Sequence, residues 1–141
     1  MVDFSNLSVG EELPALQTDK ISRTTLALYA GASGDHNPIH IDPDFAASAG
    51  FDDIFAQGML SMAYLGRLLT NWVPQSYIKN IDVRFSSITP VNIDIICTGI
   101  IKSKTESASQ KTLEIEIEAK DGNTGDIKIL GLALLDFNST L

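Results

Sequence analysis

Cysteine is almost absent from the sequence, because Cys97 is the only thiol among 141 residues. A single thiol cannot form an intrachain disulfide or a cysteine-based metal cluster. Cys97 lies in an apolar run typical of a strand, so we expect an unreactive core residue. The sequence predicts no metal site.

The sequence also shows no targeting or membrane segment. Its N-terminus has neither the basic region nor the apolar region of a signal peptide. No uncharged apolar stretch is long enough to cross a bilayer. We therefore expect a soluble cytoplasmic protein.

Positive charge is scarce: 10 lysines and arginines against 18 aspartates and glutamates give a formal net charge of −8. This balance argues against nucleic acid and anionic membranes as partners, because both repel an acidic protein. An anionic substrate would need a local group of cations. The candidate cations for such a group are Arg67, Lys79, Arg84, Lys102, Lys104 and Lys111.

The length predicts one domain over residues 1–141 with a sizeable core. Three helices are expected in its first half. Ser22 is a typical N-cap for a helix over 23–33. Asp42, followed by proline, begins a short second helix. Apolar residues occupy nearly every side of residues 58–73, which predicts a long and mostly buried third helix.

The second half predicts four strands that are rich in β-branched residues. They cover residues 78–88, 93–102, 112–120 and 127–137. Residues 121–125 are a good hairpin turn, and a short first strand is expected between 9 and 20. Together these elements predict an α+β fold, in which an antiparallel sheet wraps around one long central helix.

Both histidines, His36 and His40, lie in a polar bend between the first two helices. Pro38 lacks an N–H and restricts Asn37 to extended geometry, so Asp35 and His40 lie on two sides of the bend. A carboxylate beside a histidine can perform acid–base chemistry near neutral pH. The alternative is a polar turn with one buried, hydrogen-bonded histidine, and residue types alone leave both open.

The stretch from Tyr29 to His40, followed by Asp42-Pro43, closely resembles the hydratase motif of the MaoC-like family. Gly58-Met59-Leu60 and Val83-Arg84-Phe85 also match that family. It includes (R)-specific enoyl-CoA hydratases and (3R)-hydroxyacyl-acyl-carrier-protein dehydratase subunits. The resemblance covers essentially the whole chain and implies the hot-dog fold.

By this resemblance the chain is an enzyme of fatty acid metabolism, a hydro-lyase. It would reversibly hydrate trans-2-enoyl thioesters to (R)-3-hydroxyacyl thioesters. Asp35 and His40 match the catalytic pair, and Gly58 matches the residue whose N–H polarises the thioester carbonyl. We expect His40 to act as the base and Asp35 as the proton donor to Cα, and the opposite assignment stays open. Asn37 would orient the bend or reach the water.

The expected partner is the acyl thioester itself, and no cofactor is implied beyond coenzyme A or acyl carrier protein as the substrate's carrier. Arg84 is the first candidate to bind this anionic carrier; the alternative is a solvated surface arginine. An unpaired sheet edge is a liability, and the resemblance implies that two layers pair into one sheet. We expect a homodimer, with a higher even-numbered oligomer or a heterodimer as alternatives.

One position departs from the family, which commonly has histidine where this sequence has Gln57. Glutamine forms hydrogen bonds but does not titrate near neutral pH. We expect Gln57 to shape the loop beside the thioester carbonyl. The alternative is an effect on proton transfer or substrate fit.

Two other functions compete with the hydratase. One is a non-catalytic acyl-thioester-binding module or partner subunit, against which the intact Asp35/His40 pair argues. The other is a hot-dog thioesterase or the second bacterial dehydratase type, both of which often carry an acidic residue on the central helix. Residues 58–73 contain no aspartate or glutamate, which counts against both enzymes.

Overall fold

A five-stranded antiparallel sheet dominates the computed structural model, which describes residues 2–138. Its strands follow the order β1-β3-β4-β5-β2. The bounds are Leu16–Gln17 for β1, Ile78–Phe85 for β2, Ile95–Glu106 for β3, Lys111–Asp121 for β4 and Ile127–Asp136 for β5. The bounds of the long strands therefore lie within four residues of the predicted ones, while the first strand is only two residues long.

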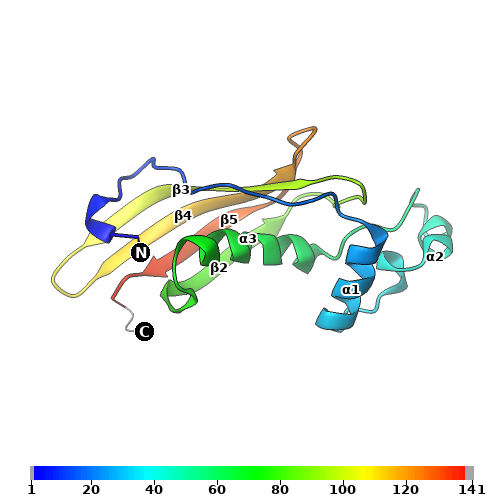
Figure 1. Ribbon diagram of the computed structural model, residues 1–141, viewed down its shortest axis with the longest axis horizontal. Helices are drawn as coiled ribbons and strands as arrows, with labels where there is room; N and C mark the ends of the chain where they lie inside the picture. The colour runs from blue at the N-terminus through cyan, green and yellow to red at the C-terminus, as the bar shows by residue number, and fades with distance from the viewer. Residues whose placement is uncertain (1, 139–141) are drawn as a thin grey trace.

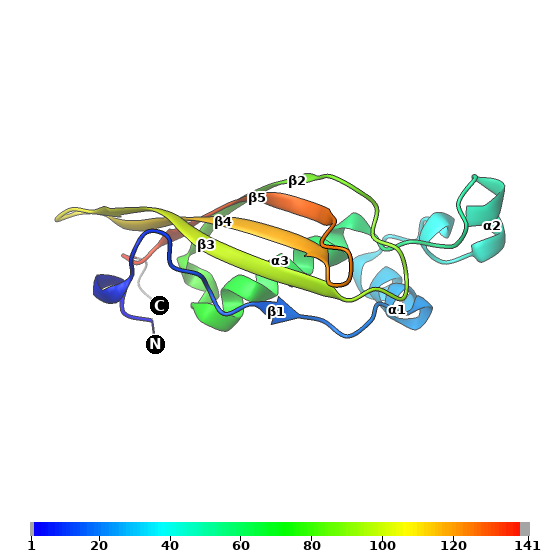
Figure 2. The ribbon, with the colours of Figure 1, turned by 90° about the horizontal axis from the view of Figure 1, so that it is seen from above.

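Three α-helices precede the long strands: α1 (Arg23–Ser33), α2 (Pro43–Ser48) and α3 (Gly58–Trp72). Helix α3 runs along one face of the sheet, whereas α1 and α2 lie beyond one end of it (Figures 1 and 2). Short 3-10 turns cover Phe4–Asn6 (η1), Pro38–His40 (η2) and Gln75–Tyr77 (η3). This arrangement confirms the predicted α+β class with one long central helix.

The local signals for α1 and α2 are confirmed in atomic detail. Ser22 caps α1 by accepting the Thr25 N–H at 3.1 Å, and the Thr25 hydroxyl in turn accepts the Ser22 N–H. Gly34 ends α1 in the left-handed conformation, with φ +77°, which costs glycine little. Asp42 caps α2 through the Asp44 N–H at 2.9 Å. These caps determine where the polar bend begins and ends.

Side-chain alternation builds the core between the sheet and α3. Leu113, Ile115 and Ile117 on β4 are fully buried and face α3, whereas the glutamates between them point to the other face of the sheet. Leu65 of α3 is also fully buried. Cys97 lies in this core on β3, where burial raises the pKa of its thiol to about 12. The prediction of an unreactive core cysteine is therefore supported.

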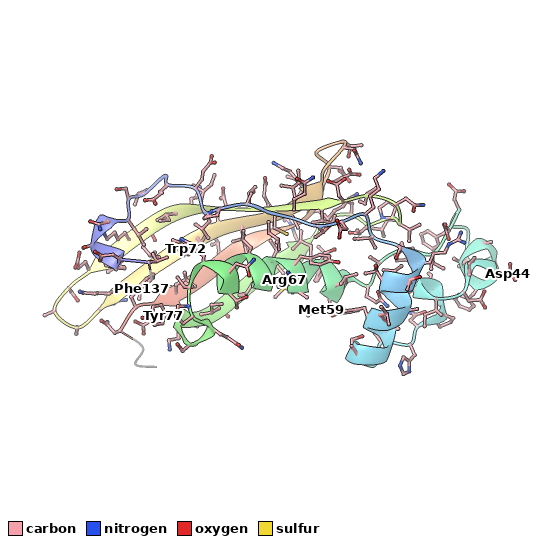
Figure 3. All side chains as sticks on the ribbon, in the orientation of Figure 1. Asp44, Met59, Arg67, Trp72, Tyr77 and Phe137 are labelled. Carbon is pink, nitrogen blue, oxygen red and sulfur yellow. The ribbon has the colours of Figure 1, made fainter. Side chains whose placement is uncertain are left out.

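The prediction of a mostly buried α3 is confirmed only in part, because the helix is buried where it faces the sheet and exposed along a stripe on the other side. The sheet covers only one side of the helix, so Met59 stays 55% exposed and Arg67 is exposed as well (Figure 3). Apolar residues all round a helix normally indicate burial all round. Here they indicate that one side of α3 has nothing to pack against among the described residues of one chain.

An aromatic group closes the end of the molecule farthest from α1. Phe137 packs against Phe4 at 5.1 Å and against Tyr77 at 5.0 Å between ring centroids. Figure 3 shows Tyr77 and Phe137 side by side beyond the C-terminal end of α3. None of the helices in the described part of the chain is long and apolar enough to cross a membrane.

Truncation of Leu65 should test the sheet–helix core. Leu65→Ala removes a fully buried side chain and should lower the free energy of unfolding by about 2–5 kcal/mol, because it leaves a cavity. Leu28→Ala is the matched control: Leu28 is 71% exposed on α1, so the change should stay within about 0.5 kcal/mol. Urea denaturation of both variants measures the difference, and equal losses would contradict this core.

Candidate active site

The polar bend is held in shape by Asn37. Its side-chain oxygen accepts the Ile39 N–H at 3.1 Å and so caps the start of the turn η2. Its own backbone N–H donates to Asp35 Oδ1 at 3.3 Å. Asn37 is exposed and does not line the cavity described below. These contacts support an orienting role for Asn37 within the bend.

The bend brings Asp35 and His40 together, as predicted. Asp35 Oδ2 lies 3.9 Å from His40 Nε2, which is too long for a hydrogen bond but close enough for both atoms to contact one small molecule. His40 is 9% exposed, whereas nearly half of the Asp35 side chain is open to solvent. His36, the other histidine, is exposed and has no part in this pair.

A second contact orients the His40 ring. Its Nδ1 lies 2.7 Å from the carbonyl oxygen of Phe55, and the rings of these two residues meet edge to face at 5.2 Å. Because a carbonyl oxygen only accepts, Nδ1 carries the proton of the neutral ring. Nε2, on the side of Asp35, is then the unprotonated nitrogen that can accept a proton.

His40 forms part of the wall of a cavity of about 330 Å³. The rest of the wall comes from the start of α3 and from the segments around it. These lining residues are Phe55, Ala56, Gly58, Ser61, Phe85, Ser86, Ser87, Ile88, Thr89 and Ile129. The cavity is mostly apolar, with an imidazole and several hydroxyl groups, which suits an apolar ligand that carries one reactive polar group.

Gly58 contributes the N-terminus of α3 to this cavity. Its N–H and that of Met59 have no acceptor within residues 2–138, whereas the Leu60 N–H bonds to Gln57 O at 3.0 Å. Free N–H groups at a helix start attract negative charge. A Cβ on Gly58 would lie 2.9 Å from the Phe85 ring, so glycine leaves room beside that ring.

Gln57 points away from the cavity. It is fully buried, and its Nε2 donates to the Leu26 carbonyl oxygen at 3.1 Å. Its Oε1 has no hydrogen-bond partner within the described residues. The contact with Leu26 ties α1 to the start of α3, which supports the expected structural role of Gln57.

Arg84 does not join the other predicted residues. It lies on the outer face of β2, where it lines a separate depression of about 260 Å³ with Asp82 and Leu132. Strand alternation explains this position, because Phe85 turns toward the His40 cavity and Arg84 must then point away. No lysine or arginine of the described chain lines the His40 cavity.

Sequence reasoning missed Phe55, Ser61 and Thr89. The Phe55 carbonyl that orients His40 is a backbone group, which residue types cannot reveal. Ser61 and Thr89 are buried and their hydroxyl oxygens lie 3.3 Å apart. The signal for Ser61 was a lone serine among apolar residues at the start of the long helix.

The described residues contain no group of three or more histidine, cysteine, aspartate or glutamate side chains arranged to hold a metal ion. The candidate site consists of an acid–base pair, a helix N-terminus and an apolar cavity.

The sequence is similar to those of two named enzymes. The chain is 27% identical to the 3-hydroxyacyl-thioester dehydratase Z of Mycobacterium tuberculosis over 126 residues, which cover 80% of this chain and 83% of the relative. It is also 27% identical to the (R)-specific enoyl-CoA hydratase of Rhodospirillum rubrum over 107 residues, covering 72% of this chain and 73% of that enzyme.

Solved structures share the fold. An (R)-hydratase from A. caviae involved in PHA biosynthesis superposes with a TM-score of 0.81 at 22% identity, covering 92% of this chain and 96% of the other. A protein described as a MaoC-like dehydratase gives a TM-score of 0.79 at 34% identity, covering 94% of this chain and 41% of the other. The predicted hot-dog fold is confirmed by these superpositions.

Residues 4–123 match the family described as "MaoC like domain". This match spans most of the chain, and the named relatives are hydratases and dehydratases. The chain belongs to the MaoC-like family of hydro-lyases.

Proposed function

We propose that this protein reversibly hydrates trans-2-enoyl thioesters to (R)-3-hydroxyacyl thioesters. The observation that carries the proposal is the orientation of His40. Its Nδ1–Phe55 contact of 2.7 Å leaves Nε2 free, 3.9 Å from Asp35 and on the wall of the cavity that Gly58 also lines. The enzymes named among its relatives act on substrates of this class.

In the forward direction, a water held between Asp35 and His40 attacks C3 of the enoyl group. His40 Nε2 takes a proton from this water, and the electrons of the double bond move toward the thioester oxygen. The Gly58 N–H stabilises the enolate charge that develops there. The pair then returns one proton to C2 through Asp35, which restores the carbonyl and leaves the two residues as they began.

The opposite assignment, with Asp35 as base and His40 as acid, places the same number of protons on the pair. Both assignments move the same protons, so the loss of rate in a variant of either residue does not tell the base from the acid. The tautomer set by Phe55 favours His40 as base, because its unprotonated nitrogen is the one beside Asp35.

A homodimer is the assembly that we propose. Strand β2 is one edge of the sheet, opposite the two-residue strand β1, and an edge strand of eight residues exposes a row of unpaired backbone groups. The open side of α3 adjoins this edge: Ala63 and Gly66 line a depression of about 370 Å³ with Ile78 and Ile81. A second copy could cover both the strand and this depression.

The carrier-binding role of Arg84 stays a proposal. Its neighbour Phe85 lines the cavity, and Arg84 is exposed on the same strand. Arg84 points to the outer face of this strand, so a carrier that leaves the cavity beside Phe85 would have to cross the edge of β2 to reach the guanidinium. Coenzyme A and acyl carrier protein are both anionic, so this contact would be attractive.

Substitution of the pair is the direct test of the reaction. Asp35→Asn and His40→Gln should each slow hydration by roughly 10²–10⁴-fold, the usual contribution of a positioned acid or base. Loss of the enoyl absorbance of crotonyl-CoA measures the rate, and circular dichroism checks the fold. His36→Gln is the matched control, since His36 lies in the same bend but is exposed.

Near-wild-type rates in either variant would remove that residue from the mechanism. Binding of crotonyl-CoA to the wild type without turnover would favour a non-catalytic acyl-thioester-binding module. Loss of the fold in both variants would favour the alternative interpretation, in which the bend is a polar turn and His40 has a structural role.

Sedimentation should show a dimer. We expect the mass of two chains across a concentration series, because β2 and the open side of α3 both lack a partner in the part of the chain that the structure describes. A concentration-independent monomer with full activity would refute the assembly. A mass of four or more chains would show that further surfaces pair as well.

Replacement of Arg84 should affect binding and not chemistry. Arg84→Gln should raise KM for a CoA substrate and leave kcat nearly unchanged, the pattern expected when uniform binding is lost. The defect should shrink at high salt, which screens the attraction in the wild type as well. Lys79→Gln, at the other end of β2, is the control. An unchanged KM at low salt would rule out Arg84 and direct attention to Lys102, Lys104 and Lys111.

A further inference from the structure

The wall of the His40 cavity contains a buried pair of hydroxyl groups. Ser61, on the first turn of α3, is 1% exposed, and Thr89, after β2, is 5% exposed. Their oxygens lie 3.3 Å apart, and both residues line the cavity together with His40 and Gly58. The acid–base chemistry described above uses neither hydroxyl.

The two sides of the cavity differ in exposure. Phe85 and Ile88 are 50% and 51% exposed, whereas Ala56 and Ile129 are at most 4% exposed. A bulky hydrophilic carrier must remain on the open side, so the acyl tail of the substrate would extend toward the enclosed side. Ser61 and Thr89 belong to that enclosed side by their burial.

The position of Ser61 fits a contact with this tail. It follows Gly58 by three residues, so the two lie on one face of α3 and about 4.5 Å apart along its axis. A thioester oxygen at the Gly58 N–H would therefore place the carbons just beyond C3 near the hydroxyl pair.

The pair has one hydrogen-bond donor more than it uses. Two hydroxyls supply two donors, and their mutual contact takes one. Neither hydroxyl has another hydrogen-bond partner within residues 2–138. Water in the cavity can accept from the remaining O–H, but a methylene cannot, and a buried donor without a partner is costly.

We infer that Ser61 and Thr89 make the site selective for enoyl thioesters whose acyl tail carries a hydrogen-bond acceptor beyond C3, over hydrocarbon tails of equal length. This inference rests on the proposed hydratase function and adds the polarity of the acyl group to it. The acceptor oxygen takes the free hydroxyl donor, whereas a hydrocarbon tail displaces water and leaves that donor unmatched.

Two substrates of equal length test the selectivity. One is trans-2-heptenoyl-CoA, and the other is its 5-oxa analogue, in which an ether oxygen replaces the fifth carbon. The ratio of their kcat/KM values, ether over hydrocarbon, should be about tenfold higher in the wild type than in Ser61→Ala/Thr89→Val, the effect of about one hydrogen bond. Ser86→Ala is the matched control, because Ser86 lines the cavity but is exposed, and its ratio should equal that of the wild type.

Turnover of both substrates with the same ratio in the wild type and the double variant would overturn the inference and leave the hydratase function intact. A wild type that hydrates neither these substrates nor crotonyl-CoA would overturn the hydratase function itself. If the double variant does not fold, Ser61→Cys/Thr89→Val serves, because it keeps both side-chain shapes and leaves only a weak S–H donor in place of the two hydroxyls. An unchanged ratio in that variant would also overturn the inference.

Discussion

The contact between His40 Nδ1 and the Phe55 carbonyl oxygen is the one on which the rest of the site depends. It selects the tautomer of the ring, aims Nε2 toward Asp35, and joins the polar bend to the segment that leads into α3. Since Gly58 follows Phe55 by three residues, the same short segment carries the histidine's anchor and the free N–H at the helix start. The two halves of the proposed chemistry are thus positioned by a single stretch of backbone.

The sheet side of the site holds that stretch in place. Phe55 pairs with Pro90 as an isolated bridge, and the Ala56 N–H donates to the Thr89 carbonyl oxygen at 2.8 Å. Thr89 also reaches Ser61 through its hydroxyl. Residues that are separated by 28 to 35 positions are therefore held in one neighbourhood, which is what an acid–base pair and an oxyanion donor need in order to act on the same molecule.

The single sheet layer explains both the buried core of the fold and its exposed surfaces. One face of the sheet buries the alternating residues of β4 against Leu65 and its neighbours on α3. Within residues 2–138, the other side of α3 has no partner and β2 has an unpaired edge. The depression beside Ala63 and Gly66 lies where these two exposed features meet. The incomplete burial of a helix that is apolar on nearly every side is the physical reason to expect a second copy.

The sequence by itself determined the elements and the chemistry of the bend. Caps at Ser22 and Asp42 and the alternation in β4 act within a few residues, so helix starts and strand faces could be predicted from local patterns. The same locality placed Asp35 and His40 on two sides of one turn. Only the tertiary structure decided which groups meet them. The Phe55 carbonyl, the Ser61–Thr89 hydroxyl pair and the outward direction of Arg84 depend on how α3 packs against the sheet, and such long-range contacts leave no periodic signal in the chain.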